Sequence, residues 1–275
     1  MRTPDGAAME ILFVVILLAL FVAAFLQRLA GFGYGLIGAP VALCLFSPFE
    51  VSFLMAFWGT ANSLPTTLLL RQHVPWQTFR TLLVWLLLGL ILGYAGLLFL
   101  PPVIFKMLAI LICLQALVSV YYPEHATRGI GWTADHRIAA TLAGTLQSSV
   151  SIPGPPLVVA FNAMRLTHNA FVSLFALVFL GVGLVRIAVS FGFMAIALVS
   201  PTMAERLPDH ILLYAVTGAA VSVLGVLTAQ PLVSRVSSAL FKKIAAGLIA
   251  LSALTLLTDV LGWSPHIAAL FGVRS

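Results

Sequence analysis

Charged residues are scarce in this sequence. Only 8% of the 275 residues are Asp, Glu, Lys or Arg, whereas about a quarter are charged in an ordinary soluble domain. A soluble domain of this length could not cover its surface with so few charges, and 61% of the residues are hydrophobic. Lipid must therefore solvate much of the surface. The composition predicts an all-α, polytopic membrane protein with a single membrane domain, residues 1–275.

Cysteine and catalytic clusters are also scarce. Cys44 and Cys113 lie far apart in apolar segments, without the spacing of metal ligands, so both are expected to be thiols facing lipid or core. The six histidines occupy loops or segment ends and form no zinc motif. No nucleophile, base and acid share a segment interior. We therefore expect no enzyme activity, no metal and no other cofactor.

The net charge of +6 comes from basic residues scattered over short loops. Nucleic acid is not an expected partner, because such partners require a basic patch. The expected partners are the lipid bilayer and a small anionic substrate, and a monomer and a homo-oligomer both fit. The first apolar stretch has no basic leader and no small-residue cleavage site, so we expect it to remain as a helix.

The apolar segments of the chain form two similar halves. A polar break at 27–35 interrupts the first half, and a second break at 147–156 lies at the same place in the second half. With an offset of 120 residues the halves align without gaps. The sequence thus predicts two repeats, 9–122 and 136–262, each with an interrupted hairpin and three full transmembrane helices. Chance agreement of apolar segments is the alternative. The expected helices are 11–26, 36–46, 51–70, 79–100, 103–121, 138–146, 157–164, 169–199, 211–229 and 244–261.

The parity of the crossings predicts that the repeats are inverted. Three full crossings are an odd number, so the second half enters the membrane from the opposite side. If the N-terminus is periplasmic, eight Lys or Arg residues lie in cytoplasmic loops and four lie outside. The positive-inside rule then favours this orientation in a bacterial inner membrane.

The sign of the charge inside the apolar segments is the most informative feature. All eight acidic residues lie in loops, tails or segment ends, whereas Arg28 and Arg186 lie within or beside apolar segments. An intramembrane charge is costly and usually has a function or a partner, and a substrate anion is a natural partner here. Two alternatives remain. Arg28 could mark a helix end, and Arg186 could extend to the headgroups. The run at 169–199 is too long for the bilayer core and must tilt, protrude or break, with glycines at 181, 183 and 192 as break points.

The two breaks are predicted to form an oxyanion site. The short arms after them begin near mid-membrane and direct free N–H groups and a positive dipole end toward the break. The alternative is a packing device, because small residues also bring helices close together. Tyr34 either caps the cavity or fills space, and Asn62 either lines it with Ser63 or bridges helices. The expected substrate-binding residues are Gln27, Arg28, Gly31, Gly33, Tyr34, Gly35, Asn62, Gln147, Ser148, Ser149, Ser151, Gly154 and Arg186.

Both breaks resemble motifs of the TauE/SafE family of membrane permeases, the sulfite exporter family. The first break and its arm, Gly31-Phe32-Gly33-Tyr34-Gly35-Leu36-Ile37-Gly38-Ala39-Pro40, are similar to the family's G-F-G-x-G-x-x-x-x-P form. The second, Ser151-Ile152-Pro153-Gly154-Pro155-Pro156-Leu157-Val158, is similar to its G-x-G-G-P-P-[LV] form. Ser151 and Pro153 replace glycines of that form, and proline removes an N–H donor. The resemblance covers essentially the whole chain and implies transport of sulfite, sulfonates or related sulfur anions, often outward.

Charge type and resemblance together predict a permease that moves a small anion by alternating access. An anion channel is the first alternative, because the same lining would serve it. A membrane subunit without transport of its own is the second.

Overall fold

Most of the described part of the chain is helical. The computed structural model describes residues 6–42, 45–46, 48–122, 135–149, 153–199, 211–235 and 237–261. No strand occurs within these ranges, so the all-α prediction is confirmed. The helices are α1 (Gly6–Ala30), α2 (Tyr34–Ala42), α3 (Pro48–Leu70), α4 (Trp76–Phe99), α5 (Pro102–Tyr121), α8 (His136–Ser149), α9 (Gly154–Ala163), α10 (His168–Val199), α12 (Ile211–Ala229) and α13 (Ser238–Val260), with 3-10 turns η1 (Arg71–His73) and η2 (Gln230–Arg235).

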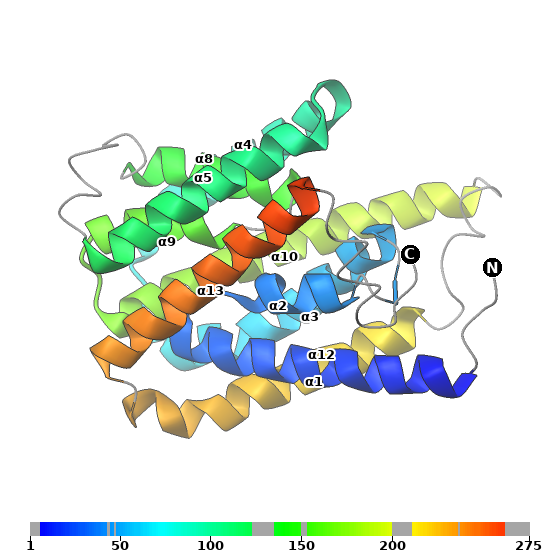
Figure 1. Ribbon diagram of the computed structural model, residues 1–275, viewed down its shortest axis with the longest axis horizontal. Helices are drawn as coiled ribbons and strands as arrows, with labels where there is room; N and C mark the ends of the chain where they lie inside the picture. The colour runs from blue at the N-terminus through cyan, green and yellow to red at the C-terminus, as the bar shows by residue number, and fades with distance from the viewer. Residues whose placement is uncertain are drawn as a thin grey trace.

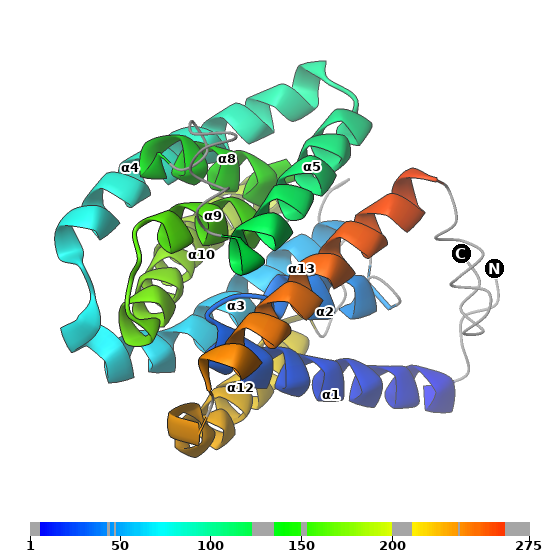
Figure 2. The same ribbon diagram turned by 60° about the vertical axis from the view of Figure 1, so that its left-hand side comes forward.

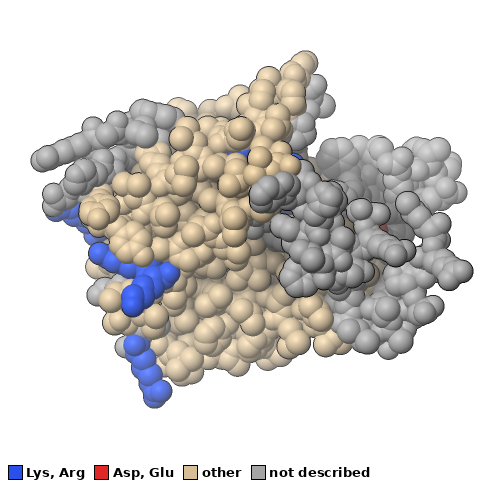
Figure 3. Space-filling model, in the orientation of Figure 1, with Lys and Arg blue, Asp and Glu red and all other residues tan. Residues whose placement is uncertain are grey.

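Several helices have the length and hydropathy of membrane spans. Among the described residues these spans are Phe13–Ala30, Trp76–Gly96, His168–Val189 and Ile211–Val233, and Val103–Val118 is a shorter apolar helix. Large apolar side chains such as Phe99 and Val216 are exposed, at 83% and 67%. On the face shown in Figure 3, most of the visible Lys and Arg side chains lie at one end, and a broad uncharged surface covers much of the remainder that is not grey. Lipid is the solvent that suits such a surface, so the prediction of a multi-pass membrane protein is confirmed.

Both breaks are shorter than the sequence suggested. Residues 27–30 complete α1, and α2 already begins at Tyr34. Likewise α8 continues to Ser149 and α9 begins at Gly154, while residues 150–152 lie outside the described part of the chain. The expected breaks at 27–35 and 147–156 were therefore too wide. Backbone groups at membrane depth must be hydrogen-bonded internally, and this favours helix wherever the sequence permits it.

The long run after the second hairpin is one continuous helix. α10 spans 32 residues without interruption, so of the three alternatives a break at a glycine does not occur, whereas tilt and protrusion stay open. Two of these glycines instead allow close packing. A Cβ on Gly183 would meet the Thr60 side chain, and one on Gly181 would lie 3.3 Å from Leu83.

The helix boundaries repeat at the predicted offset through the first part of each half. α2 and α9 begin at 34 and 154, and α3 and α10 begin at 48 and 168. The gapless alignment does not extend further, because α4 begins at 76 and α12 at 211.

Helix packing follows the same correspondence. α1 packs on α12, whereas α8, the counterpart of α1, packs on α4, the counterpart of α12. α3 packs on its own counterpart α10, and α5 packs on α13. Two repeats related by a two-fold axis would pair in this way. The inverted orientation of the halves in the membrane stays a prediction.

The buried apolar residues form two hydrophobic cores, and Figure 2 shows the helices from which they are built. One is built mainly from α1, α2, α3 and α12 and includes the buried Trp58. The other is built mainly from α4, α5, α8, α9, α10 and α13 and includes the buried Phe175. The boundary between these cores holds the two breaks.

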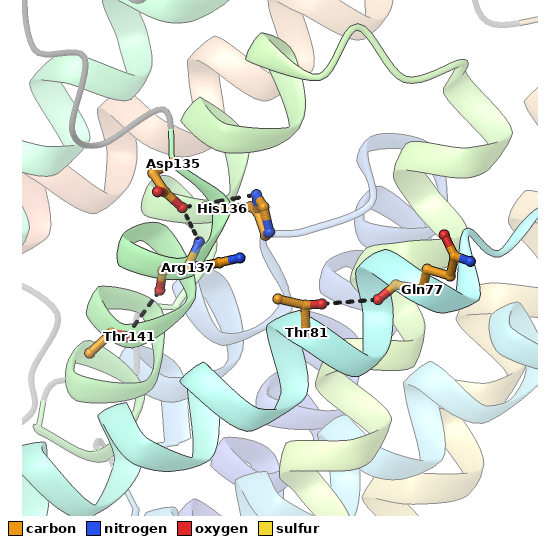
Figure 4. A network of polar contacts seen from close by, with 6 residues as sticks. All are labelled: Gln77, Thr81, Asp135, His136, Arg137 and Thr141. Atoms are coloured by element: carbon orange, nitrogen blue, oxygen red, sulfur yellow. Dashed lines mark hydrogen bonds and ion pairs between the residues drawn. The ribbon is translucent and has the colours of Figure 1, made fainter.

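α4 and α8 pack closely because small residues face one another. A Cβ on Gly144 would meet the backbone oxygen of Leu86, and the Thr145 hydroxyl donates to the Gly89 carbonyl at 3.2 Å. At the start of α8 the Asp135 carboxylate accepts the Arg137 N–H at 2.8 Å and so caps the helix (Figure 4). This close contact places Ser148 against α4, where a Cβ on Gly93 would meet it.

Candidate functional site

The first break is a three-residue turn that requires glycine. Gly31 has φ +86° and Gly33 has φ +113°, in the region that residues with a side chain rarely adopt. Phe32 between them is fully buried, and its ring lies 5.6 Å from that of Phe175. The turn therefore anchors the break in the core while reversing the chain direction.

Gln27 and Tyr34 close the first hairpin. The Tyr34 N–H donates to Gln27 Oε1 at 3.0 Å. This bond uses the amide oxygen of Gln27 and does not involve its –NH2 group, which is the donor of that side chain. The Ser222 hydroxyl donates to the Gly218 carbonyl at 2.6 Å, so the Tyr34 hydroxyl, 2.6 Å from Ser222 Oγ, donates to that oxygen. Tyr34 thus ties the start of α2 to α12.

The two breaks meet in space. The Phe32 ring lies 3.2 Å from the position of a Cβ on Gly154, at the start of α9. Residues from both breaks line one cavity, which is partly open to the outside. The expected site residues that line it are Gln27, Gly33, Tyr34, Gly35, Gln147, Gly154 and Arg186.

Arg186 supplies the positive charge of this cavity. It is the only charged residue among the described residues of the lining. Its side chain is 7% exposed and is hydrogen-bonded to that of Tyr94 on α4. Arg186 is thus a buried residue of the cavity lining, and its contact with a substrate stays a prediction.

Arg28 does not line the cavity. Its side chain is 2% exposed, and its Nε and Nη2 atoms donate to Gln230 Oε1 at 2.8 and 2.6 Å. The third nitrogen, Nη1, has no hydrogen-bond partner within the described part of the chain. Arg28 therefore joins the end of α1 to η2, through a residue 202 positions away.

Replacing Gln230 by Ala is expected to lower the free energy of unfolding by about 1.5–3 kcal/mol, because a buried guanidinium loses the acceptor of two hydrogen bonds. Gln230→Glu keeps an acceptor at the same place and should retain most of the stability. Thermal unfolding of the purified variants in detergent measures both. Equal melting temperatures for Gln230→Ala and the parent would contradict this assignment.

The remaining expected site residues lie outside the described lining. The Ser148 hydroxyl is 3.2 Å from the Gly144 carbonyl, and the Ser149 hydroxyl donates to the Thr145 carbonyl at 2.7 Å. Asn62 is buried at 1% exposure behind the cavity wall. Gly31 shapes the turn without lining the cavity. Ser151 lies outside the described residues.

Other lining residues were not among the expected substrate-binding residues, although the sequence left Ser63 open as a lining residue. Most are apolar or small and come from the middle of α3 and α10, where no local motif marks them. The 120-residue offset was a usable signal, because it pairs Gly59 with Phe179 and Ser63 with Gly183, and all four line the cavity. The residues are Phe32, Leu36, Met55, Ala56, Gly59, Thr60, Ser63, Pro153, Phe179, Val182 and Gly183.

These features describe a multi-helix membrane protein in which a mostly apolar cavity with a few polar groups lies between two bent hairpins and takes its walls from both helical cores. The chain belongs to the family described as Sulfite exporter TauE/SafE, which it matches over residues 16–256. The resemblance seen in the two break motifs is therefore confirmed. Membership implies a membrane transporter of sulfur-containing anions. No curated protein and no solved structure matches the chain.

Proposed function

We propose that the protein exports a small sulfur oxyanion, sulfite or an organosulfonate, by alternating access, and that the anion binds in the cavity between the two breaks. One observation carries the proposal: residues of both breaks and the buried guanidinium of Arg186 line the same cavity.

The lining suits an oxyanion chemically. A guanidinium presents a planar fork of N–H donors that matches two oxygens of a sulfonate or sulfite group. The –NH2 groups of Gln27 and Gln147 and the hydroxyl of Ser63 are neutral donors on residues that line the same cavity. α2 and α9 begin at Tyr34 and Gly154, which both line the cavity, so two helix dipoles direct their positive ends toward it.

The arrangement of the cores supports alternating access. The cavity takes its walls from helices of both cores, so a relative rocking of the cores would open it first to one side and then to the other. Inverted repeats, a periplasmic N-terminus and a bacterial inner membrane belong to the same proposal. No enzyme activity is part of it, and a monomer and a homo-oligomer both fit it.

The membrane potential favours outward movement of an anion. In a cell that is negative inside, each exported negative charge gains about 2.3 kcal/mol per 100 mV. The membrane potential therefore favours export over import for the same anion concentration on both sides.

Purified protein in liposomes should take up labelled sulfite or a small organosulfonate with saturable kinetics and should show counterflow. A small cation such as choline should not be transported, because the cavity is lined by a guanidinium and neutral donors. Protein-free liposomes measure the leak. Flux without saturation and without counterflow would favour a channel, and absence of flux for every sulfur anion would contradict the proposal.

A further inference from the structure

Asn62 is a buried amide for which the described part of the chain provides no hydrogen-bond partner. Its side chain is 1% exposed, and neither Nδ2 nor Oδ1 has a hydrogen-bond partner among the described residues. The neighbouring Ser63 is also 1% exposed, and its hydroxyl has no partner in the same part of the chain. An unpaired buried polar group costs about 1–3 kcal/mol, so a pair of them in one turn of a helix calls for a functional reason.

The place of Asn62 in the repeat supplies such a reason. α3 and α10 begin 120 residues apart, and that offset pairs Asn62 with Val182 and Ser63 with Gly183. Val182, Gly183 and Ser63 line the cavity, whereas Asn62 does not. In this state α10 therefore has both residues of the pair 182–183 in the cavity lining, whereas α3 has only one of the corresponding residues, Ser63.

In a transporter built from two inverted repeats, the opposite-facing state arises when the halves exchange conformations. The surface that α10 now presents to the cavity would then be presented by α3. We propose that Asn62 turns into the cavity in this opposite-facing state and there donates, together with Ser63, to the transported oxyanion. This inference rests on the proposed function and on the predicted repeat.

A proline in α3 gives the helix a place to bend. Pro65 lies inside α3 and has no N–H, so the Ala61 carbonyl lacks its usual intrahelical donor. Bends in helices concentrate at such positions. The freed carbonyl directly precedes Asn62, so a change of bend here would reorient the amide.

The charge of the surroundings selects an anion for this step. Ser63 lines the same cavity as Arg186, and a guanidinium opposes a bound cation. The Asn62 –NH2 group and the Ser63 hydroxyl can both donate to an oxyanion.

The test compares Asn62→Leu, Asn62→Ser and Thr67→Val in liposome flux and in thermal unfolding. Thr67 is the matched control, because it is a buried residue of the same helix whose hydroxyl already donates to the Ser63 carbonyl at 2.9 Å. Asn62→Leu should lower kcat/KM about tenfold and yet raise the melting temperature by about 2–4 °C, because an unpaired amide is removed. Asn62→Ser keeps a donor and should retain more flux than Asn62→Leu, while Thr67→Val should transport as the parent does.

A melting temperature of Asn62→Leu below that of the parent would overturn the inference, because it would assign the amide a structural role. A flux of Asn62→Leu equal to that of the parent would also overturn the inference. The same holds if transport by the parent requires Na⁺ and transport by Asn62→Leu does not. A different result would contradict the proposed function itself, namely that the parent transports none of the sulfur anions. In that case a lowered melting temperature of Asn62→Leu still identifies a structural amide.

Discussion

Replacing Arg186 by Gln is expected to lower kcat/KM for the anion about 10- to 150-fold, because hydrogen bonds from a charged donor contribute about 1.5–3 kcal/mol. The guanidinium is the only charged group among the described residues of the cavity wall. Glutamine keeps a donor but loses the charge and the two-pronged geometry. Arg186→Lys should keep the charge and recover part of the flux, although lysine lacks the planar fork.

Initial rates of labelled anion uptake across a range of concentrations measure this effect. Arg71→Gln is the control, since Arg71 is an exposed residue of η1 and its loss should leave kcat/KM near the parental value. Thermal unfolding of each variant separates lost binding from lost folding. Parental saturable flux in Arg186→Gln would show that the anion does not bind at this guanidinium.

Replacing Gly33 by Ala is expected to lower the free energy of unfolding by about 2–5 kcal/mol. Two costs add at this position. Gly33 has φ +113°, and a left-handed backbone costs a residue with a side chain about 1–2 kcal/mol. A Cβ here would also lie 2.6 Å from Leu248 Cδ1, and overpacking costs about 1–3 kcal/mol. Flux should fall as well, because the hairpin that forms the cavity wall is distorted.

Gly247→Ala is the matched control, because it adds the same methyl group beside Leu248 on α13. A Cβ on Gly247 meets nothing within 4 Å, and in a helix Ala is more favourable than Gly by up to about 1 kcal/mol. Its melting temperature should therefore equal or exceed that of the parent. Equal melting temperatures for Gly33→Ala and Gly247→Ala would show that the turn tolerates a side chain.

Local sequence predicted the two hairpins because their constraints are local. Gly31 and Gly33 allow backbone angles that other residues disfavour, so the break could be found from the residue types. The starts of α9 and α10 follow from those of α2 and α3 at the offset read from the sequence. The widths of the breaks could not be found in this way. Polar residues such as Gln27 and Ser149 look like loop residues, yet at membrane depth they are helical because the backbone must be hydrogen-bonded.

The two intramembrane arginines show what local sequence leaves open. Both stand in apolar segments and carry the same charge, but Arg28 bonds to Gln230 while Arg186 lines the cavity. The direction of each side chain depends on the helix packed beside it. For Arg28 that neighbour comes from η2, 202 residues away, and no spacing along the chain reveals it.

The sequence by itself determined that lipid solvates much of the surface of this protein and that its fold is helical. It also determined the place of both breaks and the positive sign of the charges within the apolar segments. Composition and glycine positions decide these properties, because hydration and backbone sterics act on each residue separately. The tertiary structure alone decided which polar groups face the cavity. It turned Ser148 toward α4 and left Asn62 buried without a partner among the described residues. Such choices arise from contacts between helices far apart in the chain, where packing rather than residue type selects the face.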